Sequence, residues 1–258
     1  MIINNIDNFK QKKLTPKEEK IYSILIKKIK NWIIQKVNSA NAKGISLGIS
    51  GGIDSATLAI LANEAFPETS YFYYFKTKVD SKTENDIQKL EKRLNKKIKT
   101  IDLTEEFKNI SKTLKIKSIS SKSNLKSRIF MSSLYALSEE NKTLVLGTDN
   151  FDEYYLGFFT KFGDGGCDLL PFANIKKHDV YMIADMIDVP LSIINKKPSA
   201  NLCSNLDDEK QLEFSYFDFE QWLINKNLVS DEISEKISKW HNHTQHKRDL
   251  IPKGPKVK

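Results

Sequence analysis

A glycine-rich turn with an acidic residue is the part of the sequence best suited to chemistry. The stretch ISLGISGGIDSATLAI, residues 45–60, passes from an apolar run through SGGIDS into alanine-rich sequence. It holds three of the ten glycines, Gly48, Gly51 and Gly52. Between a buried strand and a helix, such a turn lets backbone N–H groups converge on an anion. A Cβ would block either the required backbone angles or the approach of phosphate, so we expect a phosphate-binding loop here.

Asp54 suggests that this loop also binds a metal ion. Its carboxylate would repel a bound phosphate, and a Mg²⁺ ion between the two groups would remove that repulsion. Ser50 and Ser55 add hydroxyl donors around the same turn. The alternative is a tight structural turn in which Asp54 only caps a helix. The turn is not a Walker A loop, because Ile53 rather than a lysine follows Gly52, and its glycine spacing does not fit GxGxxG.

Alternating strands and helices would position this loop. Thr15 and Glu18 form a capping-box pattern that predicts a helix over residues 15–37. Apolar runs predict strands at 44–49, 70–75, 97–103 and 142–148, and helical spacing predicts helices at 55–66, 83–95, around Glu105 and at 124–141. The alternation indicates a doubly wound α/β fold, with a mostly parallel sheet and helices on both faces. We expect one domain over residues 1–258, with a catalytic core at about 15–248 and a basic tail at 249–258.

The composition restricts the class of protein. The 258 residues are 40% hydrophobic and 29% charged, as in ordinary globular proteins. The two cysteines form no CxxC pattern, which excludes a disulfide framework or a cysteine-rich zinc site. Since no signal peptide or membrane-length apolar run is visible, we expect a cytoplasmic protein without a membrane partner. The net charge of +8 is spread along the chain on lysines, which argues against a nucleic-acid partner but would attract a phosphorylated small molecule.

Several motifs resemble those of one enzyme family. SGGIDS resembles the pyrophosphate loop (PP-loop) of the ATP pyrophosphatase superfamily, which splits ATP between the α and β phosphates and transfers AMP to an oxygen. The stretch GTDNFDEYYLGFFTKFGDGGCDLLPFANIKKHDV, residues 147–180, resembles the NAD synthetase family. KKPSANL at 196–202 and HKR at 246–248 resemble further motifs of that family in the same order.

This resemblance implies a Rossmann-like adenine nucleotide α-hydrolase fold and an ammonia-dependent NAD synthetase, a carbon–nitrogen ligase of NAD biosynthesis. ATP would adenylate the nicotinate carboxylate of deamido-NAD and release pyrophosphate. Ammonia would then displace AMP and leave NAD. The family also implies Mg²⁺ and a homodimer whose dinucleotide site spans two subunits.

The resemblance assigns roles residue by residue. It implies metal ligands with a catalytic role at Asp54 and Glu153. It implies ATP contacts at Gly48, Ile49, Ser50, Gly51, Gly52, Ile53, Asp54, Ser55, Thr148, Lys177 and Ser199. It implies contacts to deamido-NAD at Arg128, Lys161, Asp168, His246 and Lys247. Arg128 has independent support, because an arginine in a lysine-dominated chain suggests a planar fork for phosphate. The alternative is a surface helix residue.

Other interpretations remain open on the sequence. The loop and basic charge also suit a tRNA-modifying pyrophosphatase, or a catalytically inactive nucleotide-binding regulator, against which intact Asp54 and Glu153 argue. The segment YFKTKVDSKTEND at 74–86 lacks the family's usual proline and glycine, so it gives no assignment of adenine or ribose contacts. FDEYYLGFF at 151–159 is expected to be buried core or subunit interface, and the family resemblance favours the interface. Cys167 is expected to be a small side chain in a turn rather than a nucleophile.

Overall fold

The computed structural model describes residues 14–197, 208–249 and 251–255. Its first helix, α2 (Pro16–Ser39), begins at the predicted capping box: the Thr15 backbone N–H donates to Glu18 Oε2 at 2.9 Å. The next elements are β1 (Ile45–Gly48), α3 (Ile53–Ala65), β2 (Ser70–Lys76), α4 (Ser81–Leu94), β3 (Lys99–Asp102), α5 (Thr104–Thr113), α6 (Ile119–Asn141) and β4 (Leu144–Leu146). They follow the predicted alternation.

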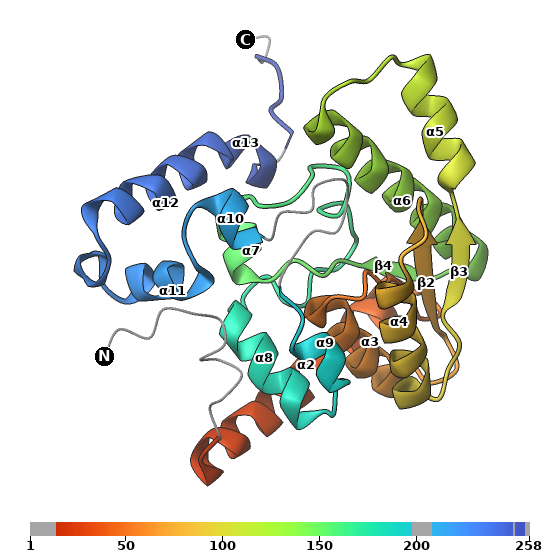
Figure 1. Ribbon diagram of the computed structural model, residues 1–258. Coiled ribbons are helices and arrows are strands. Elements are labelled where there is room, and N and C mark those ends of the chain that lie inside the picture. Colours follow the sequence, from red (N-terminus) through yellow and green to blue (C-terminus); the bar gives the residue numbers. More distant parts are fainter. Residues whose placement is uncertain (1–13, 198–207, 250, 256–258) are drawn as a thin grey trace.

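The second half of the chain adds only helices to the described elements. These are α7 (Phe151–Leu156), α8 (Lys177–Met186), α9 (Leu191–Ile194), α10 (Asp208–Leu212), α11 (Tyr216–Ile224), the 3₁₀ helix η1 (Lys226–Leu228), α12 (Asp231–His243) and α13 (Gln245–Arg248). In Figure 1, α11 and α12 lie at the left, the strands at the right, and α7 between them.

The strands form one parallel sheet in the order β3-β2-β1-β4. Ile45 of β1 lies opposite Ser70 of β2 on one side and Leu144 of β4 on the other. The chain therefore moves outward from β1 through β2 to β3, then returns to place β4 on the other side of β1. This confirms the predicted doubly wound α/β fold. In such sheets ligands bind outside the carboxyl ends of the strands where the winding reverses, here between β1 and β4.

Helices cover both faces of the sheet, as predicted. Along β2, Phe72 and Tyr74 belong to a core cluster with α2, α3 and α8, whereas Tyr73 and Phe75 pack on the other face with Leu134 of α6. Side chains of a strand alternate between faces, so an apolar residue at each of these positions requires both faces to be buried.

The predicted helix at 124–141 begins earlier than the apolar spacing indicated, at Ile119. Ser118 is its N-cap, and the Ser118 hydroxyl accepts a hydrogen bond from the Ser121 backbone N–H at 3.1 Å. The added turn is polar and exposed, so hydrophobic periodicity gave no signal for it. A serine N-cap is a sequence signal that could have located the start.

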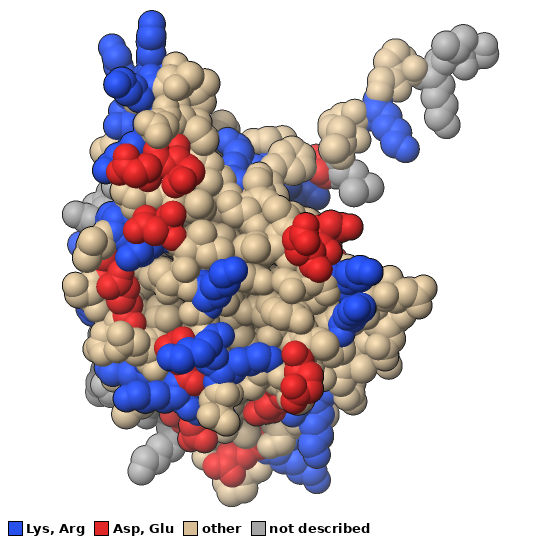
Figure 2. All heavy atoms as spheres, turned by 90° about the vertical axis from the view of Figure 1, so that its right-hand side faces the viewer, with Lys and Arg blue, Asp and Glu red and all other residues tan. Residues whose placement is uncertain are grey.

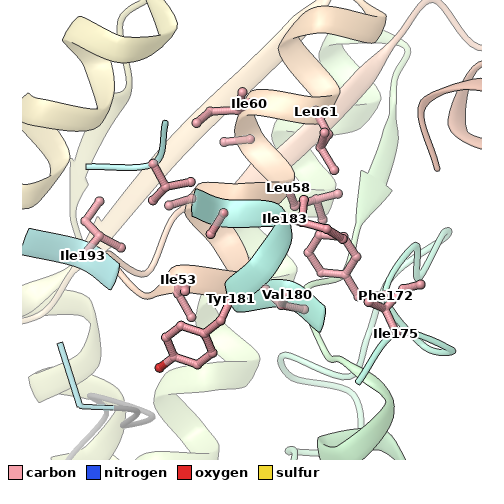
Figure 3. Close-up of a cluster of buried hydrophobic side chains, with 14 of the residues drawn as sticks. Ile53, Leu58, Ile60, Leu61, Phe172, Ile175, Val180, Tyr181, Ile183 and Ile193 are labelled. Carbon is pink, nitrogen blue, oxygen red and sulfur yellow. The ribbon is translucent and has the colours of Figure 1, made fainter. Parts of the chain in front are cut away.

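Tight packing between α3 and α8 fixes the two helices that begin beside the loop. Leu58 and Leu61 of α3 lie against Val180 and Ile183 of α8, and all four are fully buried. Figure 3 shows these side chains meeting, with the Tyr181 hydroxyl pointing away from the cluster. Burying a Leu, Ile or Val side chain contributes roughly 1.5–3 kcal/mol, so the starts of α3 and α8 are rigidly held.

The aromatic segment 151–159 packs against helices of its own chain. The Tyr155 ring stacks on His241 of α12 with centroids 4.2 Å apart. Phe151 faces Phe219 of α11 at 6.5 Å, and Phe158 meets Trp240 edge-on at 5.8 Å. Of the two expectations for this segment, core and subunit interface, these contacts favour the core.

The surface carries mixed charge. On the face shown in Figure 2, Lys and Arg side chains are interleaved with Asp and Glu side chains. Within the part of the chain that the structure describes, no helix combines the length and apolar character needed to cross a bilayer.

Candidate active site

The loop between β1 and α3 lies at the reversal point of the sheet. Its serines hold it together: the Ser50 backbone N–H donates to Ser55 Oγ at 3.2 Å, and the Gly52 N–H donates to Ser50 Oγ at 3.2 Å. Gly51 has φ +75°, and a Cβ there would come within 2.8 Å of the Thr83 methyl group. Of the three glycines, Gly51 is therefore the one that the backbone and its packing require.

The loop leaves the start of α3 open toward the pocket. The N-cap is Gly52, which has no side chain to accept from the first-turn N–H groups of this 13-residue helix. Those N–H groups and the positive end of the helix dipole favour an anion. This is the geometry that the sequence predicted for a phosphate-binding turn.

A buried lysine joins the two predicted metal carboxylates. Lys177 Nζ donates to Asp54 Oδ2 at 2.6 Å and to Glu153 Oε1 at 3.0 Å, and its side chain is only 2% exposed. Asp54 comes from the first turn of α3, Glu153 from α7 and Lys177 from the start of α8. Two carboxylates from distant parts of the sequence thus converge on one cation.

Asn150 forms hydrogen bonds with both Asp54 and Glu153. Its Nδ2 donates to Asp54 Oδ1 at 3.0 Å, and its Oδ1 accepts from the Glu153 backbone N–H at 3.1 Å. The Glu153 carboxylate accepts from the Asn150 backbone N–H in return, which completes a capping box at the start of α7. Sequence reasoning did not single out Asn150, although the spacing N-x-x-E is the signature of a capping box.

Burial and neighbouring charges shift the pKa values of Glu153 and Lys177. Burial raises the pKa of Glu153 to about 7, while the Lys177 ammonium acts in the opposite direction. For Lys177, burial disfavours the charged form, but the Asp54 and Glu153 carboxylates outweigh it and the pKa lies above its ordinary value. The Lys177 ammonium therefore stays charged beside the two largely buried carboxyl groups.

Most residues predicted to contact ATP line one pocket. The pocket is bounded by residues 48–50 and 52–55, Thr148, Glu153 and Lys177. Ser199 lies outside the described residues. Residues 74–78, which sequence reasoning could not assign, form another wall.

Two acidic residues of this pocket were missed. Asp149 follows β4 and is 5% exposed, and its Oδ2 has no hydrogen-bond partner among the described residues. Burial, followed by the nearby Asp164 carboxylate, raises the pKa of Asp149 above its ordinary value. Asp164 accepts from the Ser127 hydroxyl at 2.5 Å and also lines the pocket. Asp149 lies in GTDN at 147–150 and Asp164 in FGDGG at 162–166, and an acidic residue next to glycine in such a turn was the available sequence signal.

The residues predicted to contact deamido-NAD form a second group, around residues 157–161. Arg128 Nη2 donates to the Lys161 carbonyl at 3.2 Å, and Lys161 Nζ donates to the His246 carbonyl. Lys247 Nζ donates to two carbonyls of residues 157–161, at 2.8 and 2.7 Å. The structure brings Arg128, Lys161, His246 and Lys247 together, but their charged groups bond backbone carbonyls.

Asp168, the fifth predicted contact of this kind, supports the sheet. Its Oδ2 accepts from the Val145 backbone N–H at 2.8 Å and its Oδ1 from the Tyr135 hydroxyl at 3.0 Å. The neighbouring Cys167 is partly buried, and burial raises the pKa of its thiol to about 12. Such a thiol is not a nucleophile at neutral pH.

The arrangement suits phosphate chemistry. It offers open helix N–H groups, serine hydroxyls, a buried ammonium and two carboxylates that can share one cation. Groups of this kind position phosphates and compensate their charge during phosphoryl or nucleotidyl transfer.

Comparison with known proteins gives a consistent result. A family model described as NAD synthase matches residues 25–251. An NH(3)-dependent NAD(+) synthetase of Mycoplasmopsis pulmonis is 47% identical over 223 residues, which cover 86% of each chain. An NH(3)-dependent NAD(+) synthetase of Alkaliphilus oremlandii is 37% identical over 90% of this chain and 96% of its own.

Solved structures agree. An NMN synthetase from Francisella tularensis has a TM-score of 0.84 at 33% identity, covering 94% of this chain and 99% of that chain. An NH3-dependent NAD synthetase from Campylobacter jejuni, in complex with the nitrate ion, has a TM-score of 0.79 at 24% identity, with 91% and 99% covered, and supports the fold. The resemblance inferred from residues 147–180 is thereby confirmed, together with the ligase class that it implied. The chain belongs to the NAD synthase family.

Proposed function

We propose that the pocket between β1 and β4 amidates deamido-NAD to NAD at the expense of ATP. The observation that carries this proposal is the convergence of Asp54 and Glu153 on Lys177 beside an uncapped helix start. That geometry provides a place for a polyphosphate and its counter-cation at the reversal point of the sheet.

The reaction explains why ATP is needed. A carboxylate is a poor acceptor for ammonia, because its leaving group would be oxide. A nicotinate carboxylate oxygen first attacks the α phosphorus of ATP, and the bond to the β-phosphate oxygen breaks to release pyrophosphate. Ammonia then attacks the carbonyl carbon, loses a proton, and expels AMP from the acyl-adenylate. The protein supplies positioning and charge compensation, and needs no covalent nucleophile.

The chain's own residues divide this work. We assign the backbone of residues 48–55 and the hydroxyls of Ser50 and Ser55 to the ATP phosphates, together with Thr148, which lines the same pocket. Lys177 contributes a buried positive charge next to the same phosphates. Ser199 keeps its assignment as an ATP contact from the family motif.

The donor set fits Mg²⁺. Among the described residues no group of three or more His, Cys, Asp and Glu could hold a metal ion. Mg²⁺ at nucleotide sites, however, takes one or two carboxylates and fills its other positions with phosphate oxygens and water. Asp54 and Glu153 already face one cation, the Lys177 ammonium, within hydrogen-bonding distance. We therefore assign these two carboxylates to Mg²⁺, which would neutralise the pyrophosphate leaving group when bound.

The second group of residues is assigned to deamido-NAD. Arg128, Lys161, His246 and Lys247 place positive charge around residues 157–161, where an anionic dinucleotide could exchange its phosphates for the carbonyls now bound. Because much of this group is exposed in one chain, we propose that a homodimer completes the dinucleotide site. Asp168 is assigned with them, although its carboxylate also supports β4.

Product analysis tests the proposal. Purified protein is incubated with deamido-NAD, MgATP and ammonium, and NAD, AMP and pyrophosphate are measured. We expect equal amounts of the three products, and glutamine should not replace ammonium. Release of pyrophosphate only on addition of tRNA would contradict the proposal and favour a tRNA-modifying enzyme.

The similarity to an NMN synthetase gives a second candidate substrate. That protein is 33% identical and covers 94% of this chain. The chemistry at the carboxylate would be unchanged, and the substrate would be a nicotinate mononucleotide rather than a dinucleotide. The ratio of kcat/KM for the two substrates decides between them, and we expect it to favour deamido-NAD.

A further inference from the structure

A second lysine, Lys196, reaches the phosphate loop from outside the helices that carry Asp54 and Lys177. It follows α9 and lines the same pocket. Lys196 Nζ donates to the Gly51 carbonyl at 3.3 Å and to the Thr83 hydroxyl at 3.2 Å. The ammonium thus bridges the loop and the start of α4.

A buried aspartate holds this lysine in place. Asp86 of α4 is 2% exposed, and its Oδ2 lies 3.8 Å from Lys196 Nζ. Its Oδ1 accepts from the Ser192 hydroxyl at 2.7 Å, whereas Oδ2 has no hydrogen-bond partner among the described residues. A buried carboxylate needs a nearby cation, so Asp86 fixes where the Lys196 ammonium can sit.

The Lys196 ammonium contacts the loop at Gly51, where the backbone conformation is most constrained. Gly51 is the loop residue with positive φ, and its missing Cβ would lie 3.7 Å from Lys196 Nζ. An amide carbonyl and the following N–H point in opposite directions across a trans peptide bond. By holding the Gly51 carbonyl, Lys196 therefore helps to fix the direction of the Gly52 N–H, which donates to Ser50 Oγ, and Lys196 itself lines the same pocket.

We propose that Lys196, positioned by Asp86, is a second phosphate-binding lysine that contacts the pyrophosphate portion of ATP. This proposal rests on the proposed function, because it requires ATP phosphates in this loop. An ammonium has three N–H donors, of which two are used by Gly51 and Thr83. Among the described residues the third has no hydrogen-bond acceptor, since Asp86 Oδ2 lies 3.8 Å away, and the flexible stem allows a short movement toward a phosphate oxygen. Lys196 would act on the β and γ phosphates and not on the AMP portion that stays with the substrate.

A series of ligands tests this directly. Binding of α,β-methylene ATP, pyrophosphate and AMP, each with Mg²⁺, is measured by calorimetry for the wild-type protein and Lys196→Met. We expect the affinity for α,β-methylene ATP and pyrophosphate to fall by about tenfold or more, the loss of one charge-assisted hydrogen bond, and AMP affinity to stay within about twofold. Lys196→Arg should recover part of the loss. Lys89→Met, an exposed lysine of the same helix as Asp86, is the control for net charge.

A double variant distinguishes phosphate binding by Lys196 from neutralisation of the Asp86 charge. Lys196→Met leaves the Asp86 charge buried without its partner, so the variant should melt at a lower temperature. Lys196→Met with Asp86→Asn should recover the melting temperature but not the affinity for α,β-methylene ATP. Recovery of that affinity would show that Lys196 only neutralises Asp86, and would overturn the inference.

Two further outcomes are distinguishable. An equal loss of affinity for all three ligands would mean a general change of the pocket, and would overturn the inference alone. If wild-type protein bound none of the three, the proposed function would fail and the inference with it.

Discussion

The phosphate end of the pocket and the group around residues 157–161 differ in how completely one chain assembles them. At the phosphate end, Asp54, Glu153 and Lys177 come from three helix starts and meet at 2.6 and 3.0 Å, with their side chains largely buried. Around residues 157–161, Arg128 and Lys247 are bound to backbone carbonyls. The first group has its charges paired before substrate arrives, and the second must exchange partners.

The difference indicates a division of labour. A pre-assembled charge arrangement costs little reorganisation during the reaction, which is what transfer of AMP requires. Positive groups that rest on carbonyls can be released by a dinucleotide or by a second subunit, at the cost of the hydrogen bonds that they now make. We therefore expect substitutions at the phosphate end to change turnover and stability, and substitutions in the second group to change substrate affinity.

The largest effect is expected for the carboxylates. Asp54→Asn or Glu153→Gln should lower kcat for NAD formation by about 10²-fold or more, because each removes charge from the cation site. The variants should remain folded by circular dichroism. Asp185→Asn, at an exposed position of α8, serves as the control. Unchanged turnover in both carboxylate variants would contradict the assignment of these residues.

Lys177 should be important for folding as well as for catalysis. Lys177→Met leaves two largely buried carboxylates without their cation, and we expect the free energy of unfolding to fall by about 3 kcal/mol. Urea denaturation measures it. Lys161→Met, in the second group, should cost about 1 kcal/mol, the loss of one hydrogen bond at a half-exposed site. Similar losses in the two variants would remove the contrast between the two regions.

The second group should act on affinity. Arg128→Ala is expected to raise KM for deamido-NAD by about tenfold, because a guanidinium contact with phosphate is lost, and to leave KM for ATP nearly unchanged. Initial-rate kinetics with each substrate varied in turn measures both. A change in KM for ATP as large as that for deamido-NAD would place Arg128 at the phosphate end instead.

The smallest effect is expected for Cys167, which lies next to Asp168 and packs near Gly147. Its pKa of about 12 means that the thiol stays protonated at neutral pH, since burial disfavours the thiolate. In a Cys203→Ser background, alkylation by iodoacetamide should be slow at pH 8 and rise about tenfold per pH unit above it. Rapid alkylation at pH 7, without unfolding, would show that this turn is open and that its thiol is activated.

The structure brings together the residues that the sequence assigned to the phosphate end, and the first signals for them are local. SGGIDS lies between a strand and a helix, and Asp54 is the one carboxylate in that turn. The strand–helix alternation predicted the sheet, and family motifs added Glu153 and Lys177. The ion pair that joins these two residues with Asp54 could not be predicted, because it depends on the packing of α3 against α8.

Other features were invisible for physical reasons. Asp86 and Lys196 are 110 positions apart, and although Lys196 begins the family motif KKPSANL, nothing in the sequence pairs it with Asp86. Only the buried position of Asp86 reveals the pair. Asp168 was assigned to the substrate by its motif, whereas the structure shows its carboxylate bonded to β4, a long-range contact without a sequence signal. The homodimer, Mg²⁺ and the single-domain organisation stay predictions.

Isotope transfer tests the central claim, that this pocket moves AMP onto the nicotinate carboxylate. Deamido-NAD labelled with ¹⁸O at both carboxylate oxygens is converted with MgATP and ammonium, and the products are weighed by mass spectrometry. We predict one ¹⁸O in AMP, one in the amide of NAD, and none in pyrophosphate. Unlabelled AMP, with the ¹⁸O recovered in pyrophosphate or inorganic phosphate, would contradict the account.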